Sequence, residues 1–363
     1  MFTVRGSISL TLAAAFFGAA GCGDASDTAD AGVAEMFSNG PATLELSEWD
    51  VPWGAETRPR DPAVGPDGKV WFVGQQGNYA GYFDPETSGF ERFELGEGVG
   101  PHNLIVDDDG IVWFTGNRVG YIGRLDPATK EIQIYPMPDP AALDPHTLIF
   151  GQQPGVMFFT VQNGNFVGRF NRDTGEITLT PGPEGAPRGG GRGGASGPTS
   201  SRPYGIVQAD DGTVWVALFG TNHLGRLNPL TMELTTIPLP RSETRPRRLE
   251  TTSDGRVWYV DYSGGYLGMY DPESEEVEEW LMPSGEGSQP YAIVVDDMDR
   301  IWTVEGGVQP AMFVGFDTET KTFLTSDPLR GAPTVRHMFY DRADHTVWFG
   351  TDGGTIGKAV LPG

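Results

Sequence analysis

Side chains that can accept a proton or carry positive charge follow a proline at six places in the chain, and a seventh place repeats the pattern without the proline. A neutral imidazole can remove a proton near neutral pH, and a guanidinium can bind a carboxylate or polarise a carbonyl group. These residue types predict general-base chemistry on an anionic or carbonyl-bearing ligand. The segments are Arg58-Pro59-Arg60-Asp61, Gly100-Pro101-His102-Asn103, Asp144-Pro145-His146-Thr147, Arg202-Pro203-Tyr204-Gly205, Arg245-Pro246-Arg247-Arg248, Gln289-Pro290-Tyr291-Ala292 and Arg336-His337.

The arginines of these segments have a second, structural interpretation. Carboxylates occur within the segments, and others follow three residues after a recurring aromatic residue. Ion pairs with Asp61, Asp144, Asp261 and Glu305 would stiffen the loops without binding a ligand. Both interpretations stay open for the arginines, whereas the histidines, which lie in apolar or glycine-rich strands, favour a functional role.

The period of that aromatic residue indicates which elements hold the segments. Successive aromatic anchors are 42 to 57 residues apart, and a period in the low forties is typical of a β-propeller with one four-stranded blade per repeat. In one repeat, residues 101–107 and 111–115 predict two strands joined by a tight turn, and residues 121–125 and 131–135 predict two more. The anchors are Trp71, Trp113, Phe158, Trp215, Trp258, Trp302 and Trp348.

The last repeat stops one strand short, and a matching strand occurs near the N-terminus. Residues 46–52 are similar to residues 277–283, an outer strand of another repeat. We therefore predict an all-β, seven-bladed β-propeller of four-stranded blades over residues 43–363, with its ring closed by the N-terminal strand. Closure leaves no open sheet edge. The inner strands would line a central funnel with the proline-containing segments at its mouth.

The anchors and the composition narrow the range of functions. An aromatic residue in every blade favours packing between blades over stacking on a sugar or base, because a binding site needs only one or two such residues. The formal net charge is −24, from 49 acidic and 25 basic residues. Such a surface repels phosphates, so we expect no nucleic-acid binding. We expect a monomer that binds a small molecule or peptide in the central funnel.

The N-terminal residues predict export. Arg5 precedes an apolar stretch, residues 8–17, which is too short for an ordinary membrane span and leads through small residues to Cys22, the only cysteine. This pattern predicts a lipoprotein-type signal peptide over residues 1–22 with a lipidated Cys22; an ordinary secretory signal is the alternative. We then expect a location in the periplasm or at the cell surface, with membrane contact only through the lipid.

Two further segments predict irregular structure. Residues 23–42 are rich in Asp, Ala and Gly and predict a disordered tether. Residues 181–201 are rich in Gly, Pro and Arg and predict a flexible insertion at the mouth of the funnel. The insertion is either a flap over the funnel or a tolerated loop.

The sequence Pro-His-x-Leu-Ile-Val-Asp-x-Asp-Gly-x-Val-Trp-Phe-Thr (residues 101–115), followed by Ile-Gly-Arg-Leu-Asp-Pro-Ala-Thr (122–129), resembles the repeats of streptogramin lyases, also called virginiamycin B lyases. The resemblance implies a seven-bladed enzyme that opens a cyclic depsipeptide antibiotic by elimination across its ester, with Mg²⁺. It also implies a blade with Glu-Pro-His at the strand entrance and a second glutamate on the next strand. The glutamates would serve the metal and the histidine would be the general base. A histidine of the preceding blade would hold the substrate.

Carried over by position, the resemblance implies catalytic roles for His146, as general base, and His102, as the substrate histidine. Asp144 would replace the first glutamate, but Val161 stands at the position of the second. Glu305 holds that second position in the sixth repeat, where Gln289 and Tyr291 replace the glutamate and the histidine. The candidate metal ligands are therefore Asp144, Asp261 and Glu305, and the candidate substrate-binding residues are Arg60, Tyr204, Arg247, Tyr291, Arg336 and His337.

Two functions from different classes follow. The first is a metal-assisted lyase that acts on a cyclic depsipeptide or a related ester, and the second is a non-catalytic cell-surface propeller whose funnel binds a peptide, sugar or protein. A lactonase-like hydrolase is disfavoured because that related propeller has six blades. The carboxylates distinguish the first two functions, because Mg²⁺ needs several oxygen ligands that converge on one point.

Overall fold

The structure, a computed structural model, describes residues 43–185, 199–331 and 334–363. The predicted signal peptide (1–22) and tether (23–42) lie outside the described residues, and so do residues 186–198 of the predicted insertion. The described helix is a short 3-10 turn, Ala55–Thr57. Nowhere in the described residues is there a helix with the length and apolar character needed to cross a membrane.

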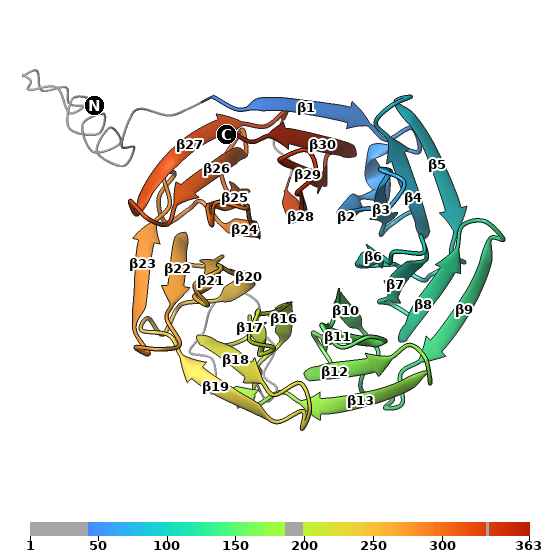
Figure 1. The fold of residues 1–363 in the computed structure, drawn as a ribbon, viewed down its shortest axis with the longest axis horizontal. Coiled ribbons are helices and arrows are strands. Elements are labelled where there is room, and N and C mark those ends of the chain that lie inside the picture. Colours follow the sequence, from blue (N-terminus) through green and yellow to red (C-terminus); the bar gives the residue numbers. More distant parts are fainter. Residues whose placement is uncertain (1–42, 186–198, 332–333) are drawn as a thin grey trace, which may run out of the picture. The chain divides into compact units, whose positions relative to one another are not determined.

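Seven four-stranded antiparallel sheets surround a common centre, as the sequence predicts (Figure 1). In blades one to six the chain runs from the inner strand outward, and each strand pairs with the next. Blades one to three are β2(Pro59–Val64), β3(Val70–Gly74), β4(Tyr79–Asp84), β5(Gly89–Glu94); β6(Leu104–Val106), β7(Val112–Gly116), β8(Tyr121–Asp126), β9(Glu131–Pro136); and β10(Pro145–Phe150), β11(Val156–Val161), β12(Phe166–Asn171), β13(Glu176–Pro181). Blades four to six are β16(Pro203–Gln208), β17(Val214–Leu218), β18(His223–Leu227), β19(Leu234–Pro238); β20(Pro246–Thr251), β21(Val257–Asp261), β22(Tyr266–Tyr270), β23(Val277–Leu281); and β24(Pro290–Val295), β25(Ile301–Glu305), β26(Met312–Asp317), β27(Thr322–Pro328).

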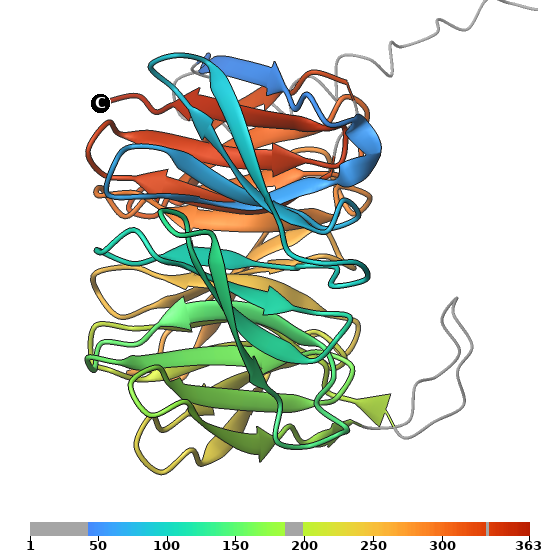
Figure 2. The ribbon, with the colours of Figure 1, turned by 90° about the vertical axis from the view of Figure 1, so that its right-hand side faces the viewer.

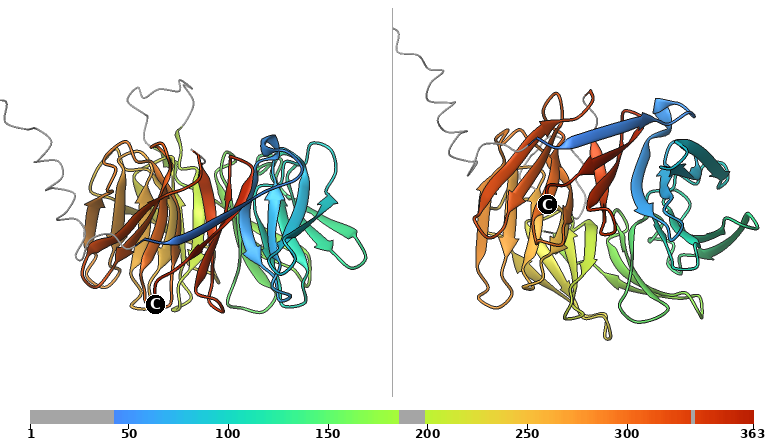
Figure 3. Two further views of the ribbon diagram at one scale, coloured as in Figure 1. Left: turned by 90° about the horizontal axis from the view of Figure 1, so that it is seen from above. Right: turned by 45° about the horizontal axis from the view of Figure 1, so that its top comes forward.

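Blade seven joins the two ends of the described chain. It consists of β28(Val335–Asp341), β29(Thr346–Thr351) and β30(Thr355–Val360), and its outer strand is β1(Glu45–Asp50). β1 runs antiparallel to β30 along its whole length, from Glu45 opposite Val360 to Asp50 opposite Thr355 (Figure 3, right). The predicted closing strand is confirmed, and it removes the free edge that β30 would otherwise expose.

The local sequence explains the strands and turns of each blade. The second strand is buried on both faces, as in β7, and it reads as a continuous run of β-branched and aromatic residues. In the outer strand β9, Ile132 and Tyr135 are half-buried and the other four residues are exposed. The turn after β8 is held by Asp126, whose carboxylate accepts the backbone N–H groups of Ala128 and Thr129 at 2.9 and 3.3 Å.

The aromatic anchors pack between blades. Trp113 of blade two belongs to an apolar cluster with Leu148 and Phe170 of blade three, and Trp258 of blade five packs with Phe316 of blade six. Each anchor is at most 4% exposed. The packing interpretation of the anchors is therefore confirmed, and the functional site must use other residues.

The two described ends of the insertion form a short ladder beside blade three. β14(Glu184–Gly185) pairs with β15(Thr199–Ser200), and the neighbouring Ser201 donates a hydrogen bond to the side-chain oxygen of Asn165 at 2.7 Å. β15 lies on the face opposite the C-terminus (Figure 2). The ends of the insertion are thus tied to blade three on the face where the inner strands begin.

Trp49 of β1 should contribute measurably to ring closure. Its ring centroid lies 4.7 Å from that of Phe83 in blade one and 5.9 Å from that of Trp348 in blade seven. Because Trp49 is only partly buried, Trp49→Ala should lower the free energy of unfolding by about 2–4 kcal/mol, measured by denaturant titration. The exposed Leu230 provides the control, since Leu230→Ala should change stability by less than about 0.5 kcal/mol. Equal effects of the two substitutions would contradict a closing role for Trp49.

Candidate functional site

A β-bulge at the start of the inner strand displaces the predicted residues from the regular ladder. The register shifts in six of the seven inner strands, and in blade two the corresponding His102 and Asn103 precede the ladder altogether. A bulge leaves a residue unpaired and re-aims its side chain. The shifts lie between Arg60 and Ala63, Pro145 and Leu148, Pro203 and Ile206, Pro246 and Leu249, Pro290 and Ile293, and Val335 and Met338.

One residue from each blade then forms a set that we call the channel ring. The rings of His102 and His146 have centroids 3.5 Å apart, and the rings of His146 and Tyr204 have centroids 4.0 Å apart. The hydroxyls of Tyr204 and Tyr291 contact each other. The structure thus brings the predicted catalytic and substrate-binding residues together, except that His337 lies one residue beyond the ring, near Arg248 and Asp61. The channel ring comprises Arg60, His102, His146, Tyr204, Arg247, Tyr291 and Arg336.

Neighbouring blades hold the bulged backbone in place. The Thr115 hydroxyl donates to the carbonyl oxygen of His146 at 3.1 Å, and the Thr160 hydroxyl donates to that of Tyr204 at 2.7 Å. Gly205 lets two inner strands approach closely, because a Cβ there would lie 2.8 Å from the Cα of Arg248. These contacts fix the channel ring on rigid strands instead of on loops.

Asp61 ties opposite sides of the ring together. Its carboxylate is fully buried and accepts hydrogen bonds from Arg60 Nε at 2.8 Å, Arg248 at 3.1 Å and the amide of Asn103 at 3.2 Å. Burial alone would raise the pKa of Asp61, but Arg60 and Arg248 outweigh burial and hold this pKa well below its usual range. The structural interpretation of the arginines is therefore correct for Arg60 and Arg248.

Arg247 has a different environment. Among the described residues no carboxylate lies within 4.0 Å of its guanidinium, and its Nε is buried without a hydrogen-bond acceptor. Its Cζ lies 3.7 Å from the ring centroid of Tyr291, 4.1 Å from that of Tyr262 and 4.7 Å from that of Phe219. The π faces stabilise the cation without neutralising it. Arg247 is thus available to bind an anion, whereas Arg336 pairs with Asp352 at 2.9 Å.

The histidines of the funnel are neutral bases. Burial lowers the pKa of His102 and of His146 well below the ordinary value, and the nearby guanidiniums lower both further. Burial likewise lowers the pKa of His337, to about 3, beside Arg248 and Asp61. Nδ1 of His146 lies 2.9 Å from the Thr147 hydroxyl, while Nδ1 of His102 and of His337 has no hydrogen-bond partner within the described part of the chain.

The pKa values of the two tyrosines of the ring shift in opposite directions. Burial opposes ionisation of both, but Arg247, Arg60 and Arg336 outweigh burial at Tyr291 and lower its pKa to about 7. The pKa of Tyr204 is raised, first by burial and then by the charge on Tyr291. The arginines therefore favour ionisation at Tyr291 over ionisation at Tyr204.

The structure does not bring the three predicted metal ligands together. Asp144 accepts hydrogen bonds from the backbone N–H groups of residues 163 and 164, and Asp261 accepts them from the N–H of Arg245 and from Arg241. Glu305 accepts from the N–H and the hydroxyl of Ser284. Burial raises the pKa of Asp144 and of Glu305, although these hydrogen bonds oppose the increase. No cluster of three or more metal-binding side chains occurs over residues 43–185, 199–331 and 334–363.

Sequence reasoning missed several residues that support the site. Asn103 joins Asp61 to blade three, because its side-chain oxygen accepts the N–H of Leu148 at 2.9 Å. Gln75 accepts a hydrogen bond from Arg60 at 3.2 Å. Asn103 lies one residue after the channel-ring residue His102, and Gln75 lies four residues after the aromatic anchor Trp71. Comparison of the repeats at these two positions would have found both.

Comparison with known proteins agrees with this architecture. The sequence model of the Virginiamycin B lyase family matches residues 43–306. The chain belongs to this family. No curated protein matches the sequence. The virginiamycin B lyase family therefore accounts for the repeat sequence over most of the propeller.

Solved structures share the fold of this virginiamycin B lyase family member. A streptogramin B lyase superposes with a TM-score of 0.75 at 24% identity, over 88% of this chain and 98% of that one. A catalytically inactive variant of the Staphylococcus aureus virginiamycin B lyase with quinupristin gives a TM-score of 0.75 at 24% identity, over 88% and 100% of the two chains. The extracellular domain of a one-component system from B. thetaiotaomicron gives a TM-score of 0.64 at 15% identity, over 88% of this chain and 40% of that one. At these identities the likeness establishes the fold alone.

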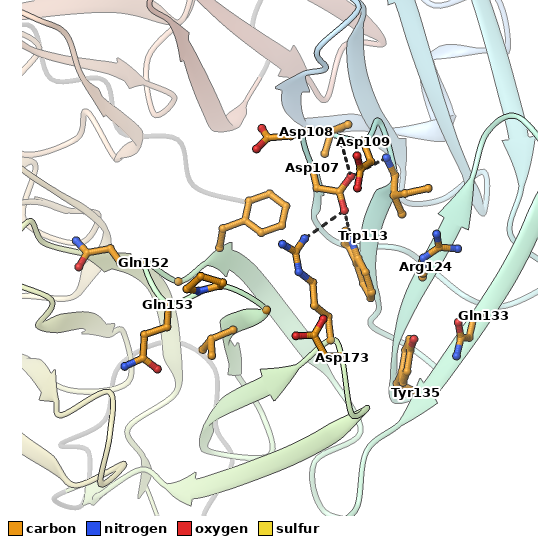
Figure 4. Close-up of a pocket in the computed structure, with 18 residues that line it drawn as sticks. Asp107, Asp108, Asp109, Trp113, Arg124, Gln133, Tyr135, Gln152, Gln153 and Asp173 are labelled. Carbon is orange, nitrogen blue, oxygen red and sulfur yellow. Dashed lines mark hydrogen bonds and ion pairs between the residues drawn. The ribbon is translucent and has the colours of Figure 1, made fainter.

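A large groove lies away from the channel ring, between blades two and three (Figure 4). It has a volume of about 990 Å³ and is lined by the turns at the far ends of the inner strands. Asp107 in this groove is already engaged, because it accepts hydrogen bonds from Trp113 Nε1 at 3.0 Å and from Arg172 at 3.2 Å. The groove contains none of the residues of the channel ring.

Loss of the Asp61 charge should destabilise this lyase-family propeller strongly. Asp61→Asn keeps the shape of the side chain but leaves Arg60 and Arg248 buried without an anion, so the free energy of unfolding should fall by about 3–5 kcal/mol. Denaturant titration would measure the change. Asp67→Asn removes a carboxylate that pairs with Lys69 at the surface and should cost less than about 1 kcal/mol. Similar losses in both variants would contradict the role of Asp61.

The buried histidines should make the protein sensitive to mild acid. Their folded pKa values lie below the unfolded value of about 6.5, so the unfolded state binds more protons as the pH falls through that value. Stability is complete above pH 6.5 and should fall by about 1.4 kcal/mol per pH unit for each of His102 and His146 below about pH 6. Unfolding titrations from pH 7 to 5 should show a shallower slope for His102→Ala, but not for His345→Ala, whose side chain is 63% exposed.

Proposed function

We propose that this protein is an exported lyase that removes a proton next to a carbonyl group of an ester ligand in the funnel and eliminates across the ester. The ligand would be a cyclic depsipeptide or a related ester. Membership of the virginiamycin B lyase family supports the reaction class. The observation that carries the proposal is the contact between two buried histidines, His102 and His146, whose pKa values are lowered by burial and by nearby guanidiniums.

In this proposal the elimination proceeds with neutral His146 as the general base. The C–H bond next to the carbonyl breaks, its electron pair forms a carbon–carbon double bond, and the ester C–O bond breaks with its electrons on the departing carboxylate. His102 packs on the base and orients it. Negative charge develops first on the carbonyl oxygen and then on the carboxylate, and Arg247 can stabilise both because no carboxylate among the described residues occupies it.

The family implies Mg²⁺, but the residues of this funnel do not fit such an ion. Mg²⁺ takes oxygen ligands in near-octahedral geometry, usually with one or two carboxylates. Asp144, Asp261 and Glu305 are each bound by hydrogen-bond donors near their own loops and do not form a cluster in the described residues. The proposed reaction therefore relies on guanidiniums for positive charge, and no step is assigned to a metal.

The alternative is a propeller that binds its ligand without converting it. One observation favours this function: the channel-ring side chains His102, His146, Tyr204 and Tyr291 are all at most 5% exposed, so a ligand must first displace part of the ring or bind above it. In both proposals we assign the protein to the periplasm or the cell surface, with the lipid at Cys22 as its membrane anchor, and we expect a monomer.

Turnover of a type B streptogramin tests the lyase proposal. We expect the purified protein to convert the cyclic antibiotic to a linear product of equal mass, separated by chromatography and identified by fragmentation in the mass spectrometer. Removal of the base in His146→Ala should lower kcat by about 10²- to 10⁴-fold. His345→Ala, at an exposed position outside the funnel, should retain full activity. Binding of the antibiotic without conversion would favour the binding propeller and contradict the lyase.

A further inference from the structure

The contact between Tyr204 and Tyr291 leaves one proton without an acceptor among the described residues. The two hydroxyls come from blades four and six, and their side chains are 3% and 1% exposed. Arg247 can donate to the Tyr204 oxygen at 3.4 Å, so Tyr204 accepts from Arg247 and can donate to Tyr291. A guanidinium has donors but no acceptor. The groups around the Tyr291 oxygen therefore favour a phenolate, which needs donors only.

The charged groups around the two tyrosines also favour a phenolate at Tyr291. Arg60 and Arg248 share the single carboxylate of Asp61, and Arg336 pairs with Asp352. Arg247 has no such carboxylate among the described residues, and its Cζ lies closest to the ring of Tyr291, at 3.7 Å. The centre of the funnel thus has an excess of buried positive charge, which is costly unless an anion is present. A phenolate at Tyr291 supplies that anion.

The pair also lies beside the proposed base. The centroids of the His146 and Tyr204 rings are 4.0 Å apart, and Tyr204 touches Tyr291, so the four rings from His102 to Tyr291 form one continuous row. An imidazolium at His146 would form among guanidiniums and would be unstable there. A neighbouring anion that accepts the proton removes this difficulty.

We propose that Tyr204 and Tyr291 form an anionic proton acceptor, with Tyr291 held as a phenolate, which takes over the proton that His146 removes from the ligand. The inference rests on the proposed elimination. The ligand C–H bond breaks and an N–H bond forms at His146; that N–H bond then breaks and the phenol O–H bond of the tyrosine pair forms. The departing carboxylate takes the place of the phenolate as the anion beside Arg247. The site therefore keeps the same net charge from start to finish.

Tyr291 of blade six occupies a position that has a catalytic role in the family pattern. Tyr291 stands where the family resemblance expects the general-base histidine, and Glu305 follows on the next strand. A phenolate at this position does not need a metal to form, since the guanidiniums of Arg60, Arg247, Arg248 and Arg336 stabilise it. The tyrosine at position 291, in place of the expected histidine, is thus explained by the arginines that surround it.

Tyrosinate absorbance of the purified full-length protein, recorded against pH, tests the ionisation. One of the 11 tyrosines should ionise near neutral pH, at about 7, while an ordinary tyrosine ionises at about 10. Tyr291→Phe should abolish the early step, and Arg247→Met should shift it to higher pH. Tyr262→Phe, which alters a ring that packs on Tyr291, should leave the step in place. Titration curves of the native protein and Tyr291→Phe that coincide up to pH 9 would overturn the proposal.

Kinetics test the transfer of the proton. Where the native protein turns over a type B streptogramin, Tyr291→Phe should lower kcat at least about 10-fold with little change in KM, and the limb of the pH–rate profile near neutral pH should disappear. Full activity with an unchanged profile would overturn the acceptor role. An early tyrosinate step without any turnover would reject the lyase and the proton transfer, while the ionised pair would remain as a feature of a binding site.

Discussion

The buried carboxylate of Asp61 is the interaction on which the funnel depends. A ring of seven sheets leaves a channel that backbone cannot fill, so side chains from distant blades must meet there. Asp61 in blade one holds Arg248 of blade five and Asn103 of blade two, and Arg248 also donates to the backbone carbonyl of Arg336 in blade seven at 2.7 Å. Four blades are thereby tied at one point. Without this anion, the guanidiniums would repel one another at low local dielectric.

The same network explains why Arg247 has no carboxylate partner among the described residues and is available to a ligand. Asp61 forms ion pairs with two arginines, and Asp352 forms one with Arg336. These two carboxylates are therefore already paired. Arg247 is then stabilised by aromatic faces instead of an anion. The chain as a whole carries a formal charge of −24, and this contrast concentrates positive potential where the inner strands begin. An anionic or enolisable ligand fits such a centre better than a cation does.

The repeats predict the fold and the position of each inner-strand residue along the central axis. They do not predict which residues of other blades it contacts. The aromatic period gives seven blades and the closing strand β1, and the bulged position after the proline gives the channel ring. The ion pair of Arg248 and Asp61 joins residues 187 positions apart in blades that are not neighbours, and no spacing encodes it. The predicted metal ligands stay apart in the described residues for a local reason. Asp261 and Glu305 end their second strands opposite the prolines, where loop N–H groups compete for carboxylates.

In the proposed reaction, arginines supply the positive charge that the family resemblance assigns to a metal, and this changes what controls the transfer of the proton. A metal site depends on ion concentration, whereas guanidiniums remain charged over the whole working pH range. In this funnel the variable charge is therefore on the tyrosine pair. A phenolate at Tyr291 and a bound carboxylate would both be stabilised by Arg247, so each weakens the other. Binding of an anion must raise the proton affinity of Tyr291, and by linkage, protonation of Tyr291 must strengthen the binding of the anion. Ligand uptake and proton uptake thus become one coupled event at Arg247.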